Sequence, residues 1–169
     1  MERQAFRYWL LGIDVMLASF LMGLVGGQRA MTPLAAVSVA AALGELPKDN
    51  GAPRLLAEPW VAGATVILAL AELAGDKMKS APDRIVGAGL TARFITSAIA
   101  GASLAPRRNR LSAAMLGGAT AVVASYPGWR TRVAMIPRYG QTPTGLVEDA
   151  IVLGSAMGIL LSRARAAVR

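Results

Sequence analysis

The chain has 169 residues, of which 54% are hydrophobic, and a mean hydropathy of +0.48. This is too apolar for a typical soluble domain and indicates an integral membrane protein. The chain contains no cysteine and no histidine, which excludes disulfides, zinc fingers, thiol nucleophiles and the usual histidine general base. The net charge of +8 comes from basic residues between the apolar stretches. We therefore expect the lipid bilayer and its anionic headgroups as partners, rather than nucleic acid, and no cofactor or metal site.

Two apolar stretches, residues 8–26 and 33–43, are separated by glycines, Gln28, Arg29 and a Thr-Pro pair. Glycine lets the backbone leave a helix, and proline fits the first turn of a new one. The pattern predicts a helix that breaks near residues 26–33 and restarts at Pro33, with Thr32 as its N-cap. One interpretation is a broken helix that forms an ion or anion site inside the bilayer. The other is an ordinary loop that leaves Arg29 at the headgroups.

The rest of the chain alternates between apolar stretches and turn-rich polar segments. The polar segment at residues 44–59 predicts a loop, and Pro127-Gly128 predicts the end of a span. A second Thr-Pro pair, Thr142-Pro143, predicts that the last helix starts at Pro143 after a basic loop over residues 129–143. The further predicted features are helices at 59–74, 85–105, 111–126 and 146–161, a capping box at 80–83 and a basic turn at 106–110. Together they predict an all-α fold, a polytopic transmembrane bundle of five to six spans in a single domain, residues 1–169.

An internal repeat is predicted, with halves at residues 10–82 and 84–164. The segment that starts at Gly63 aligns without a gap with the one that starts at Gly118, and this alignment places Lys77 on Arg132. The Arg-x-x-Thr motif that begins at Arg29 likewise matches the motif that begins at Arg93. Duplicated halves are common in transporters, whose sites lie where the repeats meet. Small residues four apart also predict close helix packing; the pairs are Gly23 and Gly27, Ser97 and Gly101, and Gly154 and Gly158.

Charged residues within or at the edges of the apolar stretches would cost several kcal/mol if they faced lipid. We therefore expect them to face the interior and to pair as arginine–carboxylate contacts. The candidate substrate or ion path consists of Gln28, Arg29, Thr32, Glu72, Asp76, Arg93, Thr96, Glu148 and Asp149. The alternative is that these pairs only lock the helices together; for Asp149, and for Asp14 near the start of the chain, the pattern favours this alternative.

Three motifs resemble a family of small bacterial inner-membrane proteins known only as domain of unknown function 4126. They are the glycine-Gln-Arg-x-x-Thr-Pro stretch that ends at Pro33, the Leu-Ala-Glu-Leu-x-x-Asp-Lys run at residues 70–77, and the Glu148-Asp149 pair after Thr142-Pro143. The resemblance covers residues 14 to 161. It implies a multi-pass protein of the inner membrane and supplies no activity and no catalytic residue.

The function that these patterns favour is a transporter or channel for a small ion or solute, with the arginines and carboxylates at the repeat interface. The alternative is a non-transporting scaffold or a partner subunit of a membrane complex. An enzyme is not expected, because the acids have basic neighbours that favour ionised, structural pairs. A homo-oligomer is expected from the short spans and small-residue faces. With six spans, ten lysine and arginine residues would lie on one side of the membrane and seven on the other. Because this difference is small, the sequence leaves the orientation of the protein in the membrane open.

Overall fold

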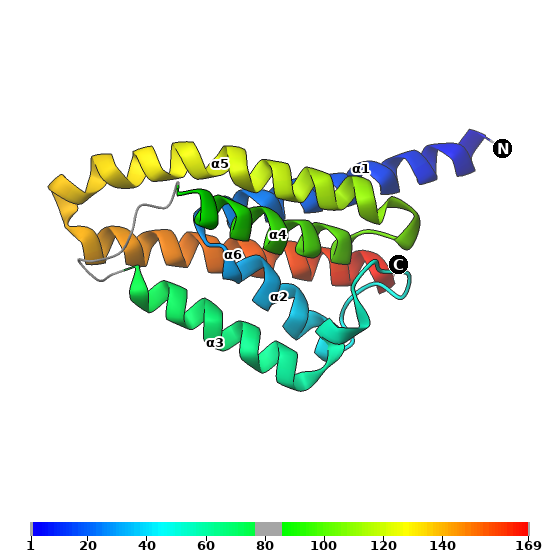
Figure 1. The fold of residues 1–169 in the computed structure, drawn as a ribbon. Helices are drawn as coiled ribbons and strands as arrows, with labels where there is room; N and C mark the ends of the chain where they lie inside the picture. Colours follow the sequence, from blue (N-terminus) through cyan, green and yellow to red (C-terminus); the bar gives the residue numbers. More distant parts are fainter. Residues whose placement is uncertain (1, 77–85, 169) are drawn as a thin grey trace.

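The computed structural model describes the backbone of residues 2–76 and 86–168, and the side chains of residues 13–76 and 86–165 (Figure 1). The predicted capping box at 80–83 and Lys77 lie outside the described residues. The described chain is all-helical, as predicted. Its α-helices are α1 (Glu2–Gln28), α2 (Met31–Ala42), α3 (Pro59–Gly75), α4 (Gly87–Leu104), α5 (Arg110–Tyr139) and α6 (Gln141–Val168). Two short 3₁₀ helices, η1 (Arg54–Ala57) and η2 (Arg107–Asn109), precede α3 and α5.

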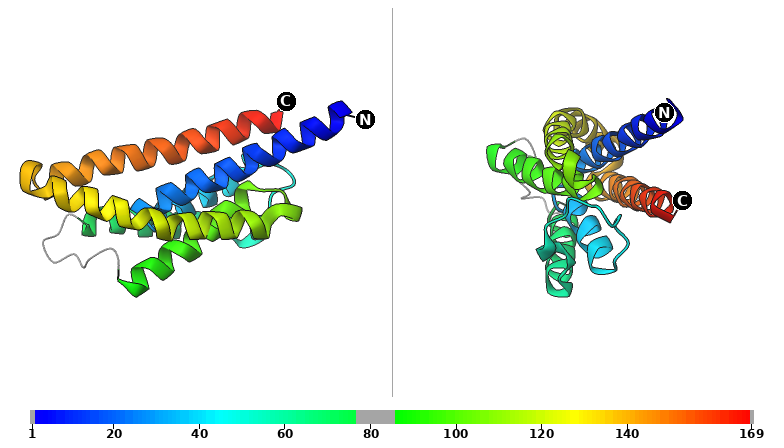
Figure 2. Two further views of the ribbon diagram at one scale, coloured as in Figure 1. Left: turned by 90° about the horizontal axis from the view of Figure 1, so that it is seen from above. Right: turned by 90° about the vertical axis from the view of Figure 1, so that its right-hand side faces the viewer.

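The helices lie roughly along one axis, and both chain termini lie at the same end of the bundle (Figures 1 and 2). At this end the loop after α2 meets the turn after α4, where Gly51 N–H donates to the Ala105 carbonyl at 2.8 Å. Arg163 of α6 reaches the same turn and donates to the Leu104 carbonyl at 3.3 Å. The break between α1 and α2, the end of α3 and the α5–α6 turn lie toward the opposite end.

Glycine allows α1, α4 and α5 to pack backbone against backbone. A Cβ atom at Gly23 would lie 2.6 Å from the Gly117 carbonyl oxygen, and one at Gly101 would lie 2.5 Å from that of Ala113. Such approaches leave no room for a side chain. Two of the three small-residue pairs therefore have the packing role that the sequence predicted. The third pair is different, because Cβ atoms at Gly154 and Gly158 would meet nothing within 4 Å.

The predicted break is present, since α1 ends at Gln28 and α2 begins at Met31. The prediction that Thr32 is the N-cap is wrong. Ala30 occupies the N-cap position without a side-chain cap, and Thr32 is the second residue of the helix. Pro33 still lies in the first turn, where a backbone N–H has no helical partner to lose.

The prediction that a span ends at Pro127-Gly128, with a loop over residues 129–143, is also wrong. Helix α5 continues through Pro127 and Pro137 to Tyr139. An interior proline costs about 3 kcal/mol, but continuation brings Gly128 against Gln28 of α1 and carries Arg132 into contact with carboxylates of α3 and α6. These tertiary contacts outweigh the local signal.

Gly140 separates α5 from α6 with a φ of 85°, a backbone conformation that favours glycine. Helix α6 begins at Gln141, so the predicted start at Pro143 is two residues late, and the helix is longer than the predicted 146–161. Among the described residues, one segment is long and apolar enough to cross a membrane, the 25-residue Gln141–Arg165, which contains an 18-residue window with a mean hydropathy of 1.6. Three shorter apolar segments are Ile13–Gln28, Met31–Ala42 and Pro59–Gly75.

Candidate functional site

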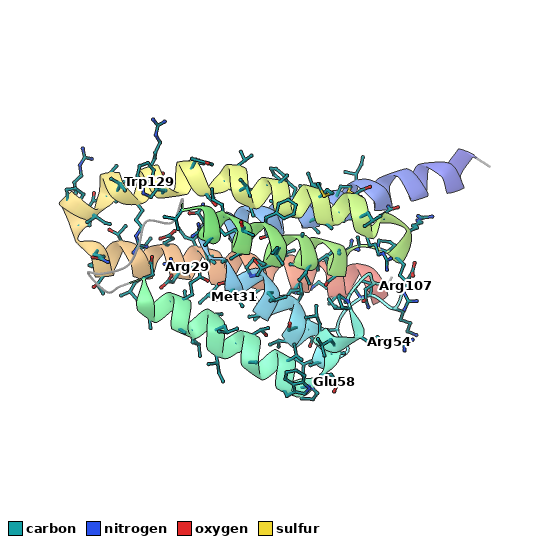
Figure 3. The ribbon with its side chains drawn as sticks, in the orientation of Figure 1. Arg29, Met31, Arg54, Glu58, Arg107 and Trp129 are labelled. Atoms are coloured by element: carbon teal, nitrogen blue, oxygen red, sulfur yellow. The ribbon has the colours of Figure 1, made fainter. Side chains whose placement is uncertain are left out.

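Arg29, which lies between α1 and α2, is the centre of a buried group of charges. Its side chain is only 1% exposed. Its Nε and Nη2 both donate to Asp149 Oδ1, at 2.8 and 2.6 Å, and Nη2 lies 2.8 Å from Asp76 Oδ2. Glu148 Oε2 lies farther away, at 3.6 Å. Figure 3 shows Arg29 well away from Arg54 and Arg107, which lie near the end that carries the chain termini.

Arg132 of α5 joins the same carboxylates from the other side. Its Nη1 lies 2.5 Å from Asp76 Oδ2 and 2.7 Å from Glu148 Oε2. Its Nη2 donates to the Asp76 backbone carbonyl at 3.0 Å, and the Gln141 side chain donates to the same oxygen at 3.1 Å. Because this carbonyl is at the C-terminus of α3, the cation also lies at the negative end of that helix dipole.

We call Arg29, Arg132, Asp76, Glu148 and Asp149 the Arg29 cluster. It holds the α1–α2 break, the end of α3, α5 and α6 together. Buried ions persist where they are paired and hydrogen-bonded, because the Coulomb attraction must offset the loss of hydration. Among the described residues, the cluster brings three carboxylates together with two guanidinium groups.

Glu72 caps the N-terminus of α2 from the neighbouring helix α3. The backbone N–H groups of Ala30 and Met31 donate to its two carboxylate oxygens at 2.7 and 2.8 Å. A carboxylate is stabilised here both by the unpaired amide donors and by the helix dipole. The helix N-terminus that the sequence marks as a candidate anion site is thus occupied by the chain's own carboxylate.

A groove with a volume of about 1130 Å³ runs beside the cluster, between α1, α5 and α6. Most of its lining is apolar, with residues such as Leu24, Met135 and Ile151. The charged residues that line it are Arg132 and Glu148. Because these two belong to the Arg29 cluster, the groove gives an apolar route to one side of a buried ionic site.

Comparison with known families identifies the chain. The model of the family described as Domain of unknown function (DUF4126) matches residues 16–164. The chain belongs to this family. The match confirms the family that the sequence motifs indicated. No curated protein and no solved structure is significantly similar to the chain.

Within this DUF4126 chain, the nine residues predicted for the path have different positions. Arg29, Asp76, Glu148 and Asp149 are brought together in the cluster, and Glu72 lies beside it at the start of α2. The other four predicted residues lie outside the cluster. The Gln28 amide donates to the Ala124 carbonyl at 3.3 Å, and the Thr96 hydroxyl donates to the Ala92 carbonyl of its own helix at 2.9 Å. The buried Thr32 hydroxyl has no hydrogen-bond partner among the described residues, and Arg93 is buried in α4.

Arg132 is the functional candidate of this DUF4126 chain that sequence reasoning missed. The sequence predicts a basic loop at this position, whereas the Arg132 side chain is 8% exposed and pairs with two carboxylates. One sequence signal pointed to it, since the predicted repeat aligns it with Lys77, the residue directly after Asp76. Its position shows that the helix continues beyond Pro127 and that the site draws one of its two cations from α5.

Proposed function

We propose that this DUF4126 protein is a multi-pass membrane protein of five to six spans that transports or conducts a small ion or solute past the Arg29 cluster. The observation that carries the proposal is the position of the cluster, a buried ionic network beside a broken helix and at the wall of an apolar groove. Intramembrane charges placed in this way are functional candidates by default, and broken helices supply binding groups in many transporters.

Exposed apolar side chains support a membrane location. On α6, which contains the segment long enough to span, Leu146, Ile151, Leu153 and Met157 are all exposed. The outer faces of α3 and α5 carry further exposed apolar residues, among them Ile67, Leu70, Leu111, Met115 and Val123. Faces of this extent would be costly in water and are stable in lipid. We place the protein in the inner membrane, with the basic residues near the chain termini at anionic headgroups.

The alternative is a non-transporting scaffold or a partner subunit, and one observation favours it. Arg29 is almost fully enclosed and directs three close contacts to two carboxylates, which is the geometry of a lock between helices. The two functions make different predictions for flux across the membrane. A transport path requires the groove, whereas ion pairs that only hold the helices together do not.

Flux in proteoliposomes tests the proposal, with small anions, small cations and protons as the probes. We expect the parent protein to conduct at least one of them and Arg132→Ala to abolish this flux. Arg130→Ala is the matched control, because Arg130 is an exposed arginine two residues away on the same helix. A parent protein silent to every probe, with Arg132→Ala only less stable, would establish the scaffold instead. Mass measurement in detergent tests the expected homo-oligomer.

A further inference from the structure

The groove between α1, α5 and α6 is as long as a membrane core is thick, and its two halves differ. Its lining on α6 runs from Pro143 to Ser162, which corresponds to about 28 Å of helix at 1.5 Å per residue. This is close to the thickness of the hydrocarbon core of a bilayer. The half near Pro143 contains the charged pair of Arg132 and Glu148. The other half, from Val152 to Ser162, is about 15 Å long, which is the depth of the acyl chains of one leaflet.

The half that ends at Ser162 has walls that suit an acyl chain. It is lined by apolar residues such as Val152 on α6 and Leu21 on α1, and its polar side chains are the hydroxyls of Ser155 and Ser162. No charged side chain of the described residues lines it. Gly158 leaves space on this wall, because a Cβ atom there would meet nothing within 4 Å. Hydrocarbon is the filling that matches such a surface.

A cation lies just beyond the apolar half. Arg165 is three residues after Ser162, so it continues the same face of α6, and it is exposed. Within the described part of the chain, no carboxylate pairs with Arg165. Figure 3 shows Arg54 and Arg107 near the same end of the bundle. The carboxylates described in the segments near this end do not line the groove; they are Asp14, Glu45, Asp49 and Glu58. Arginine binds phosphate through charge-assisted hydrogen bonds, so a matching ligand has an apolar chain that ends in a phosphate.

We infer that the half of the groove from Val152 to Ser162 binds a phospholipid, with an acyl chain along α6 and the phosphate at Arg165. The lipid belongs to the leaflet on the side of the C-terminus. A second copy inserted in the same direction would bring its own Arg165 to this end, where the like charges would repel each other. The inference rests on the membrane location in the proposed function and not on transport.

Two glycines of α6 provide a matched test of the chain-binding wall. Gly158 lines the groove and Gly154 does not, yet a Cβ atom at either position would meet nothing within 4 Å. Gly158→Leu should therefore fill the groove, and Gly154→Leu should add the same side chain outside it. Ser155→Leu, at an exposed groove position, is a second blocking variant if thermal unfolding shows that Gly158→Leu does not fold.

Two arginines provide a matched test of the phosphate contact. Arg165→Ala removes the cation at the end of the apolar half. Arg138→Ala is the control, because Arg138 is also exposed but lies near the end of α5, where the other half of the groove begins.

The probes are dioleoyl phosphatidylglycerol and dioleoylglycerol, which have the same acyl chains but only one of which carries a phosphate. Native mass spectrometry of the delipidated protein in detergent measures the bound lipid. We expect saturable phosphatidylglycerol binding to the parent, Gly154→Leu and Arg138→Ala. Loss of a hydrogen bond to a charged group should weaken this binding about tenfold in Arg165→Ala, and the filled groove should weaken it at least as much in Gly158→Leu and Ser155→Leu. Dioleoylglycerol should bind the parent and Arg165→Ala equally and more weakly.

Four results would overturn the inference. They are equal affinity of the parent for both lipids, no saturable phosphatidylglycerol binding to the parent, unchanged binding in Arg165→Ala or in the folded blocking variants, and equal weakening in Arg138→Ala. A parent dimer that Gly158→Leu converts to a monomer would also overturn it, because a second copy would then fill the groove.

The outcomes also separate this inference from the proposed function. Phospholipid binding without flux of any probe would leave the lipid site established and remove transport. Flux of small ions without saturable phospholipid binding would leave transport established and remove the lipid site. Recovery of the protein from cells without detergent would remove the membrane location itself.

Discussion

The contact between Arg29 and Asp149 gives the sharpest quantitative prediction. Arg29→Ala removes both donors from Asp149 Oδ1 and also the contact at 2.8 Å with Asp76 Oδ2. Asp76 and Glu148 keep Arg132 as a close partner, whereas Asp149, which is 9% exposed, loses two donated hydrogen bonds. The main cost is therefore the loss of the Arg29 charge and of two donated hydrogen bonds at a carboxylate that stays buried.

Loss of one partner from a buried ion pair costs about 3–5 kcal/mol. In a chain of this size each kcal/mol lowers the melting temperature by about 2–4 °C, so we expect Arg29→Ala to lower it by about 6–20 °C. Asp149→Asn should cost less, because Arg29 keeps its contact with Asp76. The double variant Arg29→Ala/Asp149→Ala should cost less than the sum of the two single alanine variants, by about 1–3 kcal/mol.

Thermal unfolding in detergent, followed by far-ultraviolet circular dichroism, measures these differences. Arg130→Ala is the control, since removal of an exposed arginine should change stability by less than about 0.5 kcal/mol. The reasoning is refuted if Arg29→Ala has the same melting temperature as Arg130→Ala. It is also refuted if the effects of the alanine variants at Arg29 and Asp149 are additive.

Three further predictions follow from the fold. Glu72→Ala should cost about 1–2 kcal/mol, because the first amides of α2 lose their cap, and Glu72→Gln should cost less; the same melts measure both, and unchanged melting would contradict the capping role. Gly27→Val should lower the free energy of unfolding by about 1–3 kcal/mol or more, since a Cβ at this position would lie 2.6 Å from Ala124 Cβ. The control is Gly63→Val, whose Cβ would meet nothing within 4 Å and whose melting temperature should equal that of the parent. Arg29 and Arg132 are buried, so they leave the count of basic residues that sets membrane orientation, which becomes ten on the side of the C-terminus and five on the other. A reporter fused to the C-terminus should therefore be active only if it works in the cytoplasm. Activity of both a cytoplasmic and a periplasmic reporter at this position would show two orientations.

The sequence by itself determined the helical fold, a helix break near residues 26–33, the family and four of the five members of the Arg29 cluster. These properties depend on local chemistry. Apolar stretches of helical length predict helices, glycines and a proline mark an interruption, and charges inside apolar stretches must pair. Arg29, Asp76, Glu148 and Asp149 were identified in this way without knowledge of their partners. The internal repeat and the use of all nine predicted residues in one path stay predictions.

The tertiary structure decided what depends on neighbours distant in the chain. Helix α5 continues through Pro127 because Arg132 gains two carboxylates from α3 and α6, a benefit that no local window of sequence contains. The N-terminus of α2 is capped by Glu72 rather than by Thr32, because the end of α3 brings a carboxylate to amides about 40 residues earlier in the chain. Likewise, Gly23 and Gly158 belong to the same sequence pattern, but only the bundle determines that a backbone carbonyl fills the space at one and an open groove lies beside the other.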